Sequence, residues 1–267
     1  MKAAHQPQPD VPILLRRDAG GVTTLTLNRP DARNALSMAL MTELRRALDE
    51  IAGDEKVRVV VIGAAGSVFC AGHDLKEIRA TPTRAAYEAL FQQCSALMLA
   101  LTRLTKPVIA KVQGMATAGG CQLVATCDLA IAANTARFAT PGVNIGLFCS
   151  TPMVALSRTV GRKPALEMLL TGDAIDATEA ARIGLINRAV EAADLDGEVA
   201  ALAGRIAAKS PLTLGIGKAA FYRQIEMDIQ SAYSFASETM TANMLAADAA
   251  EGIDAFMAKR APKWRGR

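Results

Sequence analysis

The chain lacks several features that would place a protein in a functional class at once. Its 267 residues include 30 basic and 26 acidic side chains, so the formal net charge is only +4. This near-neutral balance, without a run that mixes basic and aromatic residues, argues against nucleic acid as a partner. No apolar run is long enough to cross a membrane without a charge or a glycine. We therefore expect neither a nucleic acid nor a membrane partner.

Paired cysteines are also missing. The five cysteines are odd in number and form no C-x-x-C pair, so we expect free, buried thiols in a reducing compartment and no metal site. The polar start of the chain has neither the apolar core of a secretion signal nor the Arg and Ser content of a transit peptide. These features predict a cytoplasmic protein in which residues 1–12 are disordered.

Hydrophobic periodicity predicts an α/β fold. Residues 22–27 alternate as a half-buried strand does, and residues 57–63 are so continuously apolar that we expect a strand buried on both faces. From about residue 165 onward the pattern is almost wholly helical. We expect a core of strands and helices over residues 13–205, followed by a helical region over residues 206–267.

Two glycine turns are the strongest functional signal. No G-x-G-x-x-G follows a predicted strand, which disfavours nicotinamide chemistry. Instead, "FCAGHDLKE" (residues 69–77) and "GMATAGGCQL" (residues 114–123) each follow a strand and open a helix. Amides at the start of a helix lack partners and lie in a partly positive field. If the two turns face each other, two N–H groups can hold one oxygen, as an enolate or a tetrahedral oxyanion requires.

Together with "LNRPDARNALS" (residues 27–37) and "EGIDAFMAKRAPKW" (residues 251–264), these turns resemble the enoyl-CoA hydratase/isomerase (crotonase) superfamily. The resemblance extends from Val22 to Trp264. The run "GLFCSTP" (residues 146–152) is similar to a subgroup of enoyl-CoA hydratase domain-containing proteins. The resemblance implies a crotonase-like spiral of ββα units with a C-terminal helical trimerisation region. It also implies a homotrimer or a dimer of trimers.

The resemblance also assigns the reacting positions. It implies that the backbone N–H groups of His73 and Gly119 form the oxyanion hole. Hydratases of the family carry two glutamates, and this chain has Gln122 and Gly142 in their places. Adding water across a double bond needs one group that takes a proton and one that gives it. The chain therefore resembles the members that lack both catalytic glutamates, and we expect efficient hydration to be absent.

The resemblance implies a coenzyme A thioester as substrate and no permanently bound cofactor. The substrate-binding residues that it implies lie in the first glycine turn and its upstream partner, on the pocket loop and near the C-terminus: Arg33, Ala35, Leu36, Ala71, Asp74, Leu75, Lys76, Asn144, Cys149, Ser150, Lys259 and Lys263. Lys259 or Lys263 would reach a phosphate, across a subunit boundary if the protein is a trimer.

Several of these residues also have a structural interpretation. Asp74 is expected to cap the following helix, and Asn144 is equally typical of a turn. Cys149 and Ser150 have no evident base to activate them. The His73 side chain is expected to be exposed or to lie beside the adenine, and Asp128 is expected to be a structural carboxylate.

Three hypotheses remain open. In the first hypothesis, the protein is an acyl-CoA enzyme that relies on its oxyanion hole, in a slow hydration, an isomerisation or a decarboxylation. Alternatively it is a non-catalytic acyl-CoA binding protein. In the third hypothesis its surface matters most, in an assembly or with RNA, and the near-neutral charge counts against this. The basic tail from Lys259 is expected to be solvated, with phosphate binding as the alternative.

Overall fold

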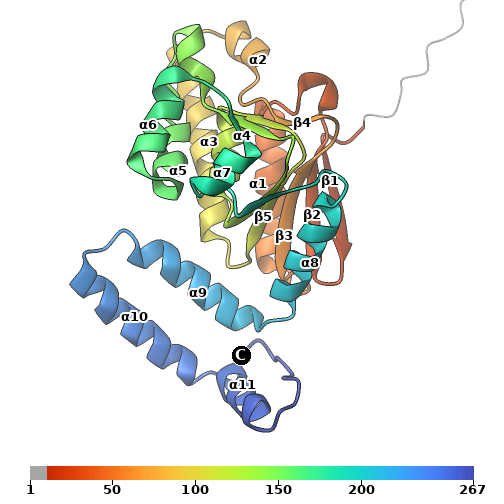
Figure 1. Ribbon diagram of the computed structural model, residues 1–267, viewed down its shortest axis with the longest axis vertical. Helices are drawn as coiled ribbons and strands as arrows, with labels where there is room; N and C mark the ends of the chain where they lie inside the picture. Colours follow the sequence, from red (N-terminus) through yellow and green to blue (C-terminus); the bar gives the residue numbers. More distant parts are fainter. Residues whose placement is uncertain (1–10) are drawn as a thin grey trace, which may run out of the picture.

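The computed structural model describes residues 11–267, with two sheets surrounded by helices and a helical arm beneath them (Figure 1). Of the segment predicted to be disordered, residues 1–10 lie outside the described residues. Residues 11 and 12 lie outside any helix or strand. Among the described residues, no helix is both long enough and apolar enough to cross a membrane.

The larger sheet has six strands in the order β1-β2-β3-β5-β7-β10. All neighbours in it are parallel except β1 and β2. Its strands are β1 (Leu14–Ala19), β2 (Val22–Leu27), β3 (Val59–Ala64), β5 (Val108–Val112), β7 (Leu129–Ala133) and β10 (Arg188–Val190).

The smaller sheet has four strands in the order β4-β6-β8-β9, of which only β8 and β9 are antiparallel. These strands are β4 (Val68–Cys70), β6 (Met115–Thr117), β8 (Arg137–Ala139) and β9 (Ile175–Asp176). Along the chain, β3 is followed by β4, β5 by β6 and β7 by β8, so each pair places one strand in each sheet. Helices separate the successive pairs. This repeat is the predicted spiral of ββα units, and the α/β crotonase-like fold is confirmed.

Eleven α-helices and two short 3-10 helices complete the part of the chain from residue 11 to residue 267. They are η1 (Pro30–Ala32), α1 (Met38–Gly53), α2 (Leu75–Ala80), α3 (Arg84–Arg103), α4 (Gly119–Thr126), η2 (Pro141–Ile145), α5 (Pro152–Thr159), α6 (Arg162–Thr171), α7 (Ala177–Arg182), α8 (Leu195–Ala207), α9 (Pro211–Gln224), α10 (Ile229–Met244) and α11 (Ala247–Met257). The predicted boundary between residues 205 and 206 stays a prediction, and α8 runs across it.

The position of strand β3 between two packed layers explains why its sequence is continuously apolar. Val60 and Ile62 pack into the main core, which includes the buried faces of α1 and α3. Val59 and Val61 face the opposite side and pack against α8. Burial on both faces is therefore confirmed, as is usual for a central parallel strand.

The prediction of an almost wholly helical chain after residue 165 is wrong in two places. Strand β9 pairs with β8 through Ile175 and Asp176, and β10 pairs with β7 as the edge strand of the larger sheet. Both strands are at most three residues long and none of their residues is fully buried. Segments this short show no alternation that periodicity could detect.

Helices α9, α10 and α11 form an arm below the two sheets (Figure 1). A buried ion pair fastens α9 to the core, since Lys218 Nζ lies 2.7 Å from Asp128 Oδ2. The Tyr222 hydroxyl donates to Asp128 Oδ1 at 2.8 Å, and the Val108 amide donates to the same carboxylate at 2.6 Å. Burial lowers the pKa of Lys218, and the charge of Asp128 opposes that effect. The structural interpretation of Asp128 is confirmed by these contacts.

The basic side chains of the tail after α11 are exposed, as expected, but the backbone of the tail is held in place. The indole N–H of Trp264 donates to the Ala208 carbonyl at 2.8 Å. Buried Asp248 accepts from the amides of Arg265 and Gly266 and from the Ser210 hydroxyl. These hydrogen bonds hold the backbone of the tail against α9 and α11, a constraint that charge composition alone does not reveal.

We expect Asp128→Ala to destabilise the protein by about 3–5 kcal/mol, because it removes the counter-charge of the buried Lys218 ammonium and leaves it only two backbone carbonyls. Urea-induced unfolding measures the change. The matched control is Asp196→Ala, which removes an ion pair with Lys111. The Asp196 side chain is 83% exposed, so this substitution should cost about 1 kcal/mol or less. An equal loss in both variants would contradict the anchoring role of Asp128.

Candidate functional site

The first glycine turn connects β4 to α2 and is held by the segment before α1. The Leu36 amide donates to the Gly72 carbonyl at 2.7 Å, and the Asp74 amide donates back to the Leu36 carbonyl at 3.3 Å. Gly72 has φ +85°, a conformation that favours glycine. This short parallel bridge leaves the His73 amide without a hydrogen-bond partner among residues 11–267. The predicted site residues Ala35, Leu36 and Ala71 are brought together here.

Asp74 fixes the orientation of this turn. Its carboxylate accepts from the Lys76 and Glu77 amides as the N-cap of α2, as predicted. It also lies 3.0 Å from the Arg29 guanidinium, which in turn donates to the Ala35 carbonyl at 2.7 Å. Burial alone would raise the pKa of Asp74, but Arg29 and the two amides together hold it below its ordinary value. Asp74 is thus a structural residue of the site.

The second glycine turn connects β6 to α4. Ala118, just before the helix, has φ 48° and ψ −115°, which is strained for a residue with a side chain. Its amide donates to the Ala139 carbonyl at 2.9 Å, and α4 begins at the next residue. Every residue of α4 is buried. The amide of Gly119, at the first helical position, therefore has no partner within the helix.

The two turns touch each other. A Cβ atom at Gly72 would lie 3.1 Å from the Gly119 amide nitrogen and 2.9 Å from the Ala118 Cβ atom. A Cβ atom at Gly119 would lie 3.7 Å from the His73 amide nitrogen. At Gly72, only a residue without a side chain allows this approach. The geometry places two amide donors beside one point, which is the arrangement that an oxyanion hole requires.

Gln122 lies one helical turn after Gly119 and is 5% exposed. Its Oε1 atom accepts a weak hydrogen bond from Cys94 Sγ on α3 at 3.8 Å. Its Nε2 atom donates to no other group in the described part of the chain. The side chain that replaces the first glutamate can therefore still give a hydrogen bond to a ligand, but an amide transfers no proton near neutral pH.

Gly142 is required by the shape of its loop. The Leu147 amide donates to the Gly142 carbonyl at 2.9 Å, which folds the loop back on itself. A Cβ atom at residue 142 would lie 2.7 Å from the Leu147 carbonyl oxygen and 2.9 Å from Cys149 Sγ. The position of the second glutamate therefore has no room for a side chain, a change of shape that the sequence did not reveal.

The other residues predicted on this loop have no activating partner. Burial raises the pKa of the Cys149 thiol, and the Gly142 backbone opposes that effect only partly. The Ser150 hydroxyl donates to the Phe148 carbonyl at 3.3 Å. Asn144 is exposed and its amide lies next to Gly172, at the C-terminus of α6. No base contacts any of the three among the described residues.

The predicted CoA-binding residues fall into two groups. Arg33 lies beside the first turn, where its carbonyl accepts from the Ala71 amide at 3.0 Å. Leu75 and Lys76 lie exposed at the start of α2. Lys259 and Lys263 follow α11, which Figure 1 shows at the opposite end of the molecule from α2. The structure does not bring these two lysines to the turns of their own chain.

The His73 side chain is not exposed as expected. Both ring nitrogens are buried, and neither forms a hydrogen bond of normal geometry, although the Leu36 backbone lies near the ring. Burial lowers the pKa of this imidazole, and the Leu36 backbone and Glu77 charge oppose that shift. The ring meets that of Phe91 edge to face, with centroids 5.7 Å apart. The sequence around His73 gives no sign that its side chain is buried without hydrogen-bond partners.

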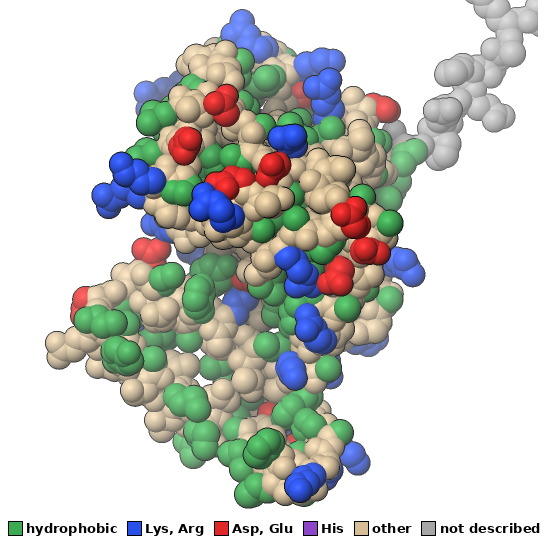
Figure 2. All heavy atoms as spheres, viewed as in Figure 1, with side chains coloured by type: hydrophobic (Ala, Val, Ile, Leu, Met, Phe, Trp, Pro, Cys, Tyr) green, Lys and Arg blue, Asp and Glu red, His purple; other side chains and the backbone are tan. Residues whose placement is uncertain are grey.

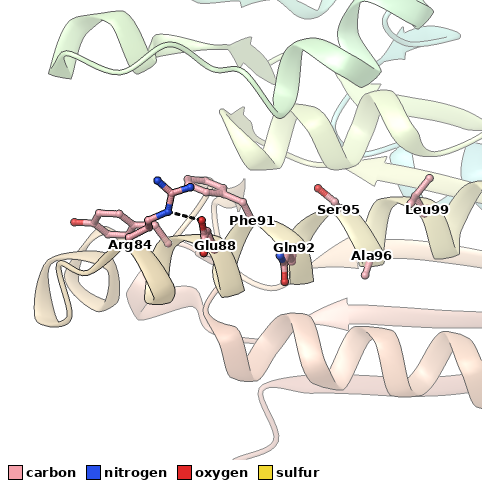
Figure 3. A pocket seen from close by; sticks show the side chains of 8 residues that line it. Arg84, Glu88, Phe91, Gln92, Ser95, Ala96 and Leu99 are labelled. Carbon is pink, nitrogen blue, oxygen red and sulfur yellow. Dashed lines mark hydrogen bonds and ion pairs between the residues drawn. The ribbon is translucent and has the colours of Figure 1, made fainter.

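Phe91 belongs to a groove that the sequence did not indicate. The groove has a volume of about 820 Å³ and runs along the exposed face of α3. Figure 3 shows Ser95 and Leu99 on one side of the helix, and Gln92 and Ala96 on the other. The groove is lined by Arg84, Tyr87, Glu88, Phe91, Gln92, Ser95, Ala96 and Leu99. It adjoins the first turn through the contact between Phe91 and His73. Within residues 11–267, no cluster of side chains is suited to hold a metal ion.

Comparisons with known proteins show the family of this chain. A profile of the family described as enoyl-CoA hydratase/isomerase matches residues 17–267. The chain is 45% identical over 258 residues to enoyl-CoA hydratase domain-containing protein 3, mitochondrial, of Rattus norvegicus. The aligned region covers 97% of this chain and 86% of the relative. The structure is similar to the crystal structure of an enoyl-CoA hydratase from Mycobacterium smegmatis, with TM-score 0.93, 56% identity and coverage of 95% and 99%. It is also similar to human enoyl Coenzyme A hydratase domain-containing protein 3, with TM-score 0.92, 44% identity and coverage of 95% and 100%.

These relatives overturn the prediction of a cytoplasmic protein. The rat, mouse and human proteins at 45–46% identity are all named mitochondrial proteins. The prediction was wrong because it rested on charge, cysteine content and the composition of the first residues. Free thiols indicate a reducing compartment and do not say which one.

We expect Gly142→Ala to destabilise the fold by about 1–3 kcal/mol, because its methyl group would press on the Leu147 carbonyl and on Cys149 Sγ. The matched control is Gly197→Ala in α8, where a Cβ atom meets nothing within 4 Å. That control should stabilise the protein by up to about 1 kcal/mol. Urea-induced unfolding separates the two, and equal effects would show that the loop yields easily.

Proposed function

The chain belongs to the enoyl-CoA hydratase/isomerase family, and we propose that it binds acyl-CoA thioesters with the thioester carbonyl between the amides of His73 and Gly119. The observation that carries the proposal is the contact between the two glycine turns. It brings two N–H groups without backbone partners among residues 11–267 close together, one of them at the start of a buried helix. Such donors act most strongly where charge develops on an oxygen that is shielded from water.

The coenzyme A moiety would lie along the first turn and its upstream partner. Segments 33–36 and 71–76 run side by side here and expose backbone groups, Arg33 and Lys76. Guanidinium and ammonium groups suit phosphates. Lys259 and Lys263 of the same chain lie at the far end of the arm, so a lysine from a second copy would have to complete the phosphate site.

A second copy also suits the surface of the arm. Figure 2 shows hydrophobic side chains gathered over α9–α11. The surface of the core above the arm carries many more charged side chains (Figure 2). Large apolar side chains are more than half exposed there, namely Phe221, Ile225, Ile229, Tyr233, Met240, Leu245, Phe256 and Met257. Contiguous exposed apolar surface usually marks an interface. We propose that the arm forms a homotrimer, or a dimer of trimers.

The acyl chain would leave the oxyanion hole along the groove on α3. Phe91 lines the groove and contacts His73, and Leu99 extends the apolar surface two helical turns further. Burying methylene groups against such surface contributes about 0.8 kcal/mol each. The groove is open at this face, so its width alone sets no sharp limit on chain length.

Efficient hydration does not fit this site. A positioned acid or base contributes about 10²–10⁴-fold each, and both are replaced, by Gln122 and by Gly142. The amide of Gln122 can orient a water molecule or a substrate oxygen, but it cannot accept a proton. Polarisation of a thioester carbonyl remains. This supports either a reaction that needs no strong base, such as decarboxylation or a slow isomerisation, or acyl-CoA binding without turnover.

The oxyanion assignment predicts that Gly119→Ala weakens binding of butyryl-CoA by about tenfold or more in calorimetric titration. The new methyl group would lie 3.7 Å from the His73 amide nitrogen, in the space meant for the carbonyl oxygen. Gly204→Ala in α8, where a Cβ atom meets nothing within 4 Å, is the control and should bind as the unmodified protein does. Unchanged binding by Gly119→Ala would place the carbonyl elsewhere.

Hydration of crotonyl-CoA, followed as loss of the enoyl absorbance, tests the missing acid and base. From a typical turnover of about 10 s⁻¹, the loss of both groups predicts on the order of 10⁻³ s⁻¹ or less. Gln122→Ala should change this residual rate little. Turnover near 10 s⁻¹ that survives Gln122→Ala would mean that another acid and base serve the site.

A further inference from the structure

The imidazole of His73 is the most unusual polar group in the site. Among residues 11–267, only four buried side-chain N or O atoms lack a hydrogen-bond partner, and two of them are its ring nitrogens. Buried polar atoms are nearly always paired, because leaving them unpaired costs stability. A fold that tolerates this cost twice on one side chain calls for a ligand that pairs with it.

The location of the imidazole ring indicates that its partner belongs to the acyl part of the bound thioester. The same residue supplies the amide of the proposed oxyanion hole, so the ring lies within one side chain's reach of the thioester carbonyl. Its edge-to-face contact with Phe91 places it beside the groove on α3. On the proposed path, the first carbons of an acyl chain would run from the two amides past this ring toward Phe91.

We propose that the His73 side chain recognises an oxygen on the third carbon of the acyl group, so that the site selects 3-oxoacyl thioesters over unsubstituted ones. This rests on the proposed function, since it assumes that the thioester carbonyl binds at the two amides. In such a thioester, the two oxygens are separated by about as many bonds as the His73 Nδ1 atom is from its own amide nitrogen. One residue can therefore contact both.

The chemistry of the ring favours a neutral oxygen over a carboxylate. Burial lowers the pKa of His73, so the imidazole is neutral at neutral pH and offers one N–H donor. Among the described residues, no Lys or Arg side chain contacts the ring. A buried carboxylate would thus remain without a counter-charge, which is costly. A keto oxygen needs only the donor that the ring provides.

The hydrogen bond to His73 should make the site bind 3-oxoacyl thioesters more tightly than thioesters with an unsubstituted acyl chain. An unsubstituted chain leaves the ring nitrogens unpaired in the complex, whereas a 3-oxo group satisfies one of them. Sites built to hydrogen-bond a substrate oxygen discriminate strongly against analogues without it. We expect at least about tenfold tighter binding of the oxygenated ligand.

Calorimetric titration with acetoacetyl-CoA and butyryl-CoA tests the proposal, because these ligands differ only in the oxygen on the third carbon. The unmodified protein should bind acetoacetyl-CoA at least about tenfold more tightly. His73→Phe keeps a planar ring against Phe91 but removes both nitrogens, so the ratio of the two affinities should fall to about one. His73→Gln, which restores a donor, should recover part of the ratio.

Thermal unfolding of the same variants separates recognition from a structural role. Because the ring nitrogens are unpaired in the free protein, His73→Phe should raise the unfolding temperature while it abolishes the selectivity. An affinity ratio that stays high in His73→Phe would overturn the proposal. So would a ratio near one in the unmodified protein.

The two proposals fail in different ways. If the unmodified protein binds both ligands equally, the recognition by His73 is wrong and acyl-CoA binding stands. If it binds neither, the proposed function is wrong and the inference falls with it. Malonyl-CoA serves as a third ligand, and its tighter binding than acetoacetyl-CoA would show that the ring selects a carboxylate instead.

Discussion

The structure of the site depends on the close approach of two backbone turns. Gly72 lies so near the second turn that a side chain there would press on Ala118 and on the Gly119 amide nitrogen. This approach brings the His73 and Gly119 amides beside one point. The strain at Ala118 and the positive φ at Gly72 are local costs of holding the turns there. Arg29, Asp74 and the buried helix α4 keep the arrangement in place.

The rest of the site has changed around this contact. At the two positions where the resemblance implies glutamates, the chain has a buried amide at Gln122 and a tightly folded loop at Gly142. The loss at Gly142 is one of shape as well as of charge, since the Leu147 carbonyl and Cys149 fill the space that a side chain would need. The buried, unpaired imidazole of His73 adds a polar group next to the acyl path. We therefore propose a site that polarises and selects more than it moves protons.

The sequence predicted much of this fold and part of the site. The α/β class, the doubly buried β3, the cap at Asp74 and the family follow from periodicity, a capping residue and motifs. The environment of His73, the groove on α3 and the closed loop at Gly142 could not be predicted. Each depends on contacts between segments far apart in the chain, and β9 and β10 are too short to show a pattern. The roles of the site residues stay predictions.

The central claim is that the amides of His73 and Gly119 hold one thioester oxygen. A crystal structure of the protein with bound butyryl-CoA tests it most directly. The account predicts a thioester carbonyl oxygen about 2.7–3.1 Å from both amide nitrogens, with the acyl chain entering the groove at Phe91. A carbonyl oxygen that contacts neither amide, in a fully occupied complex, would contradict it.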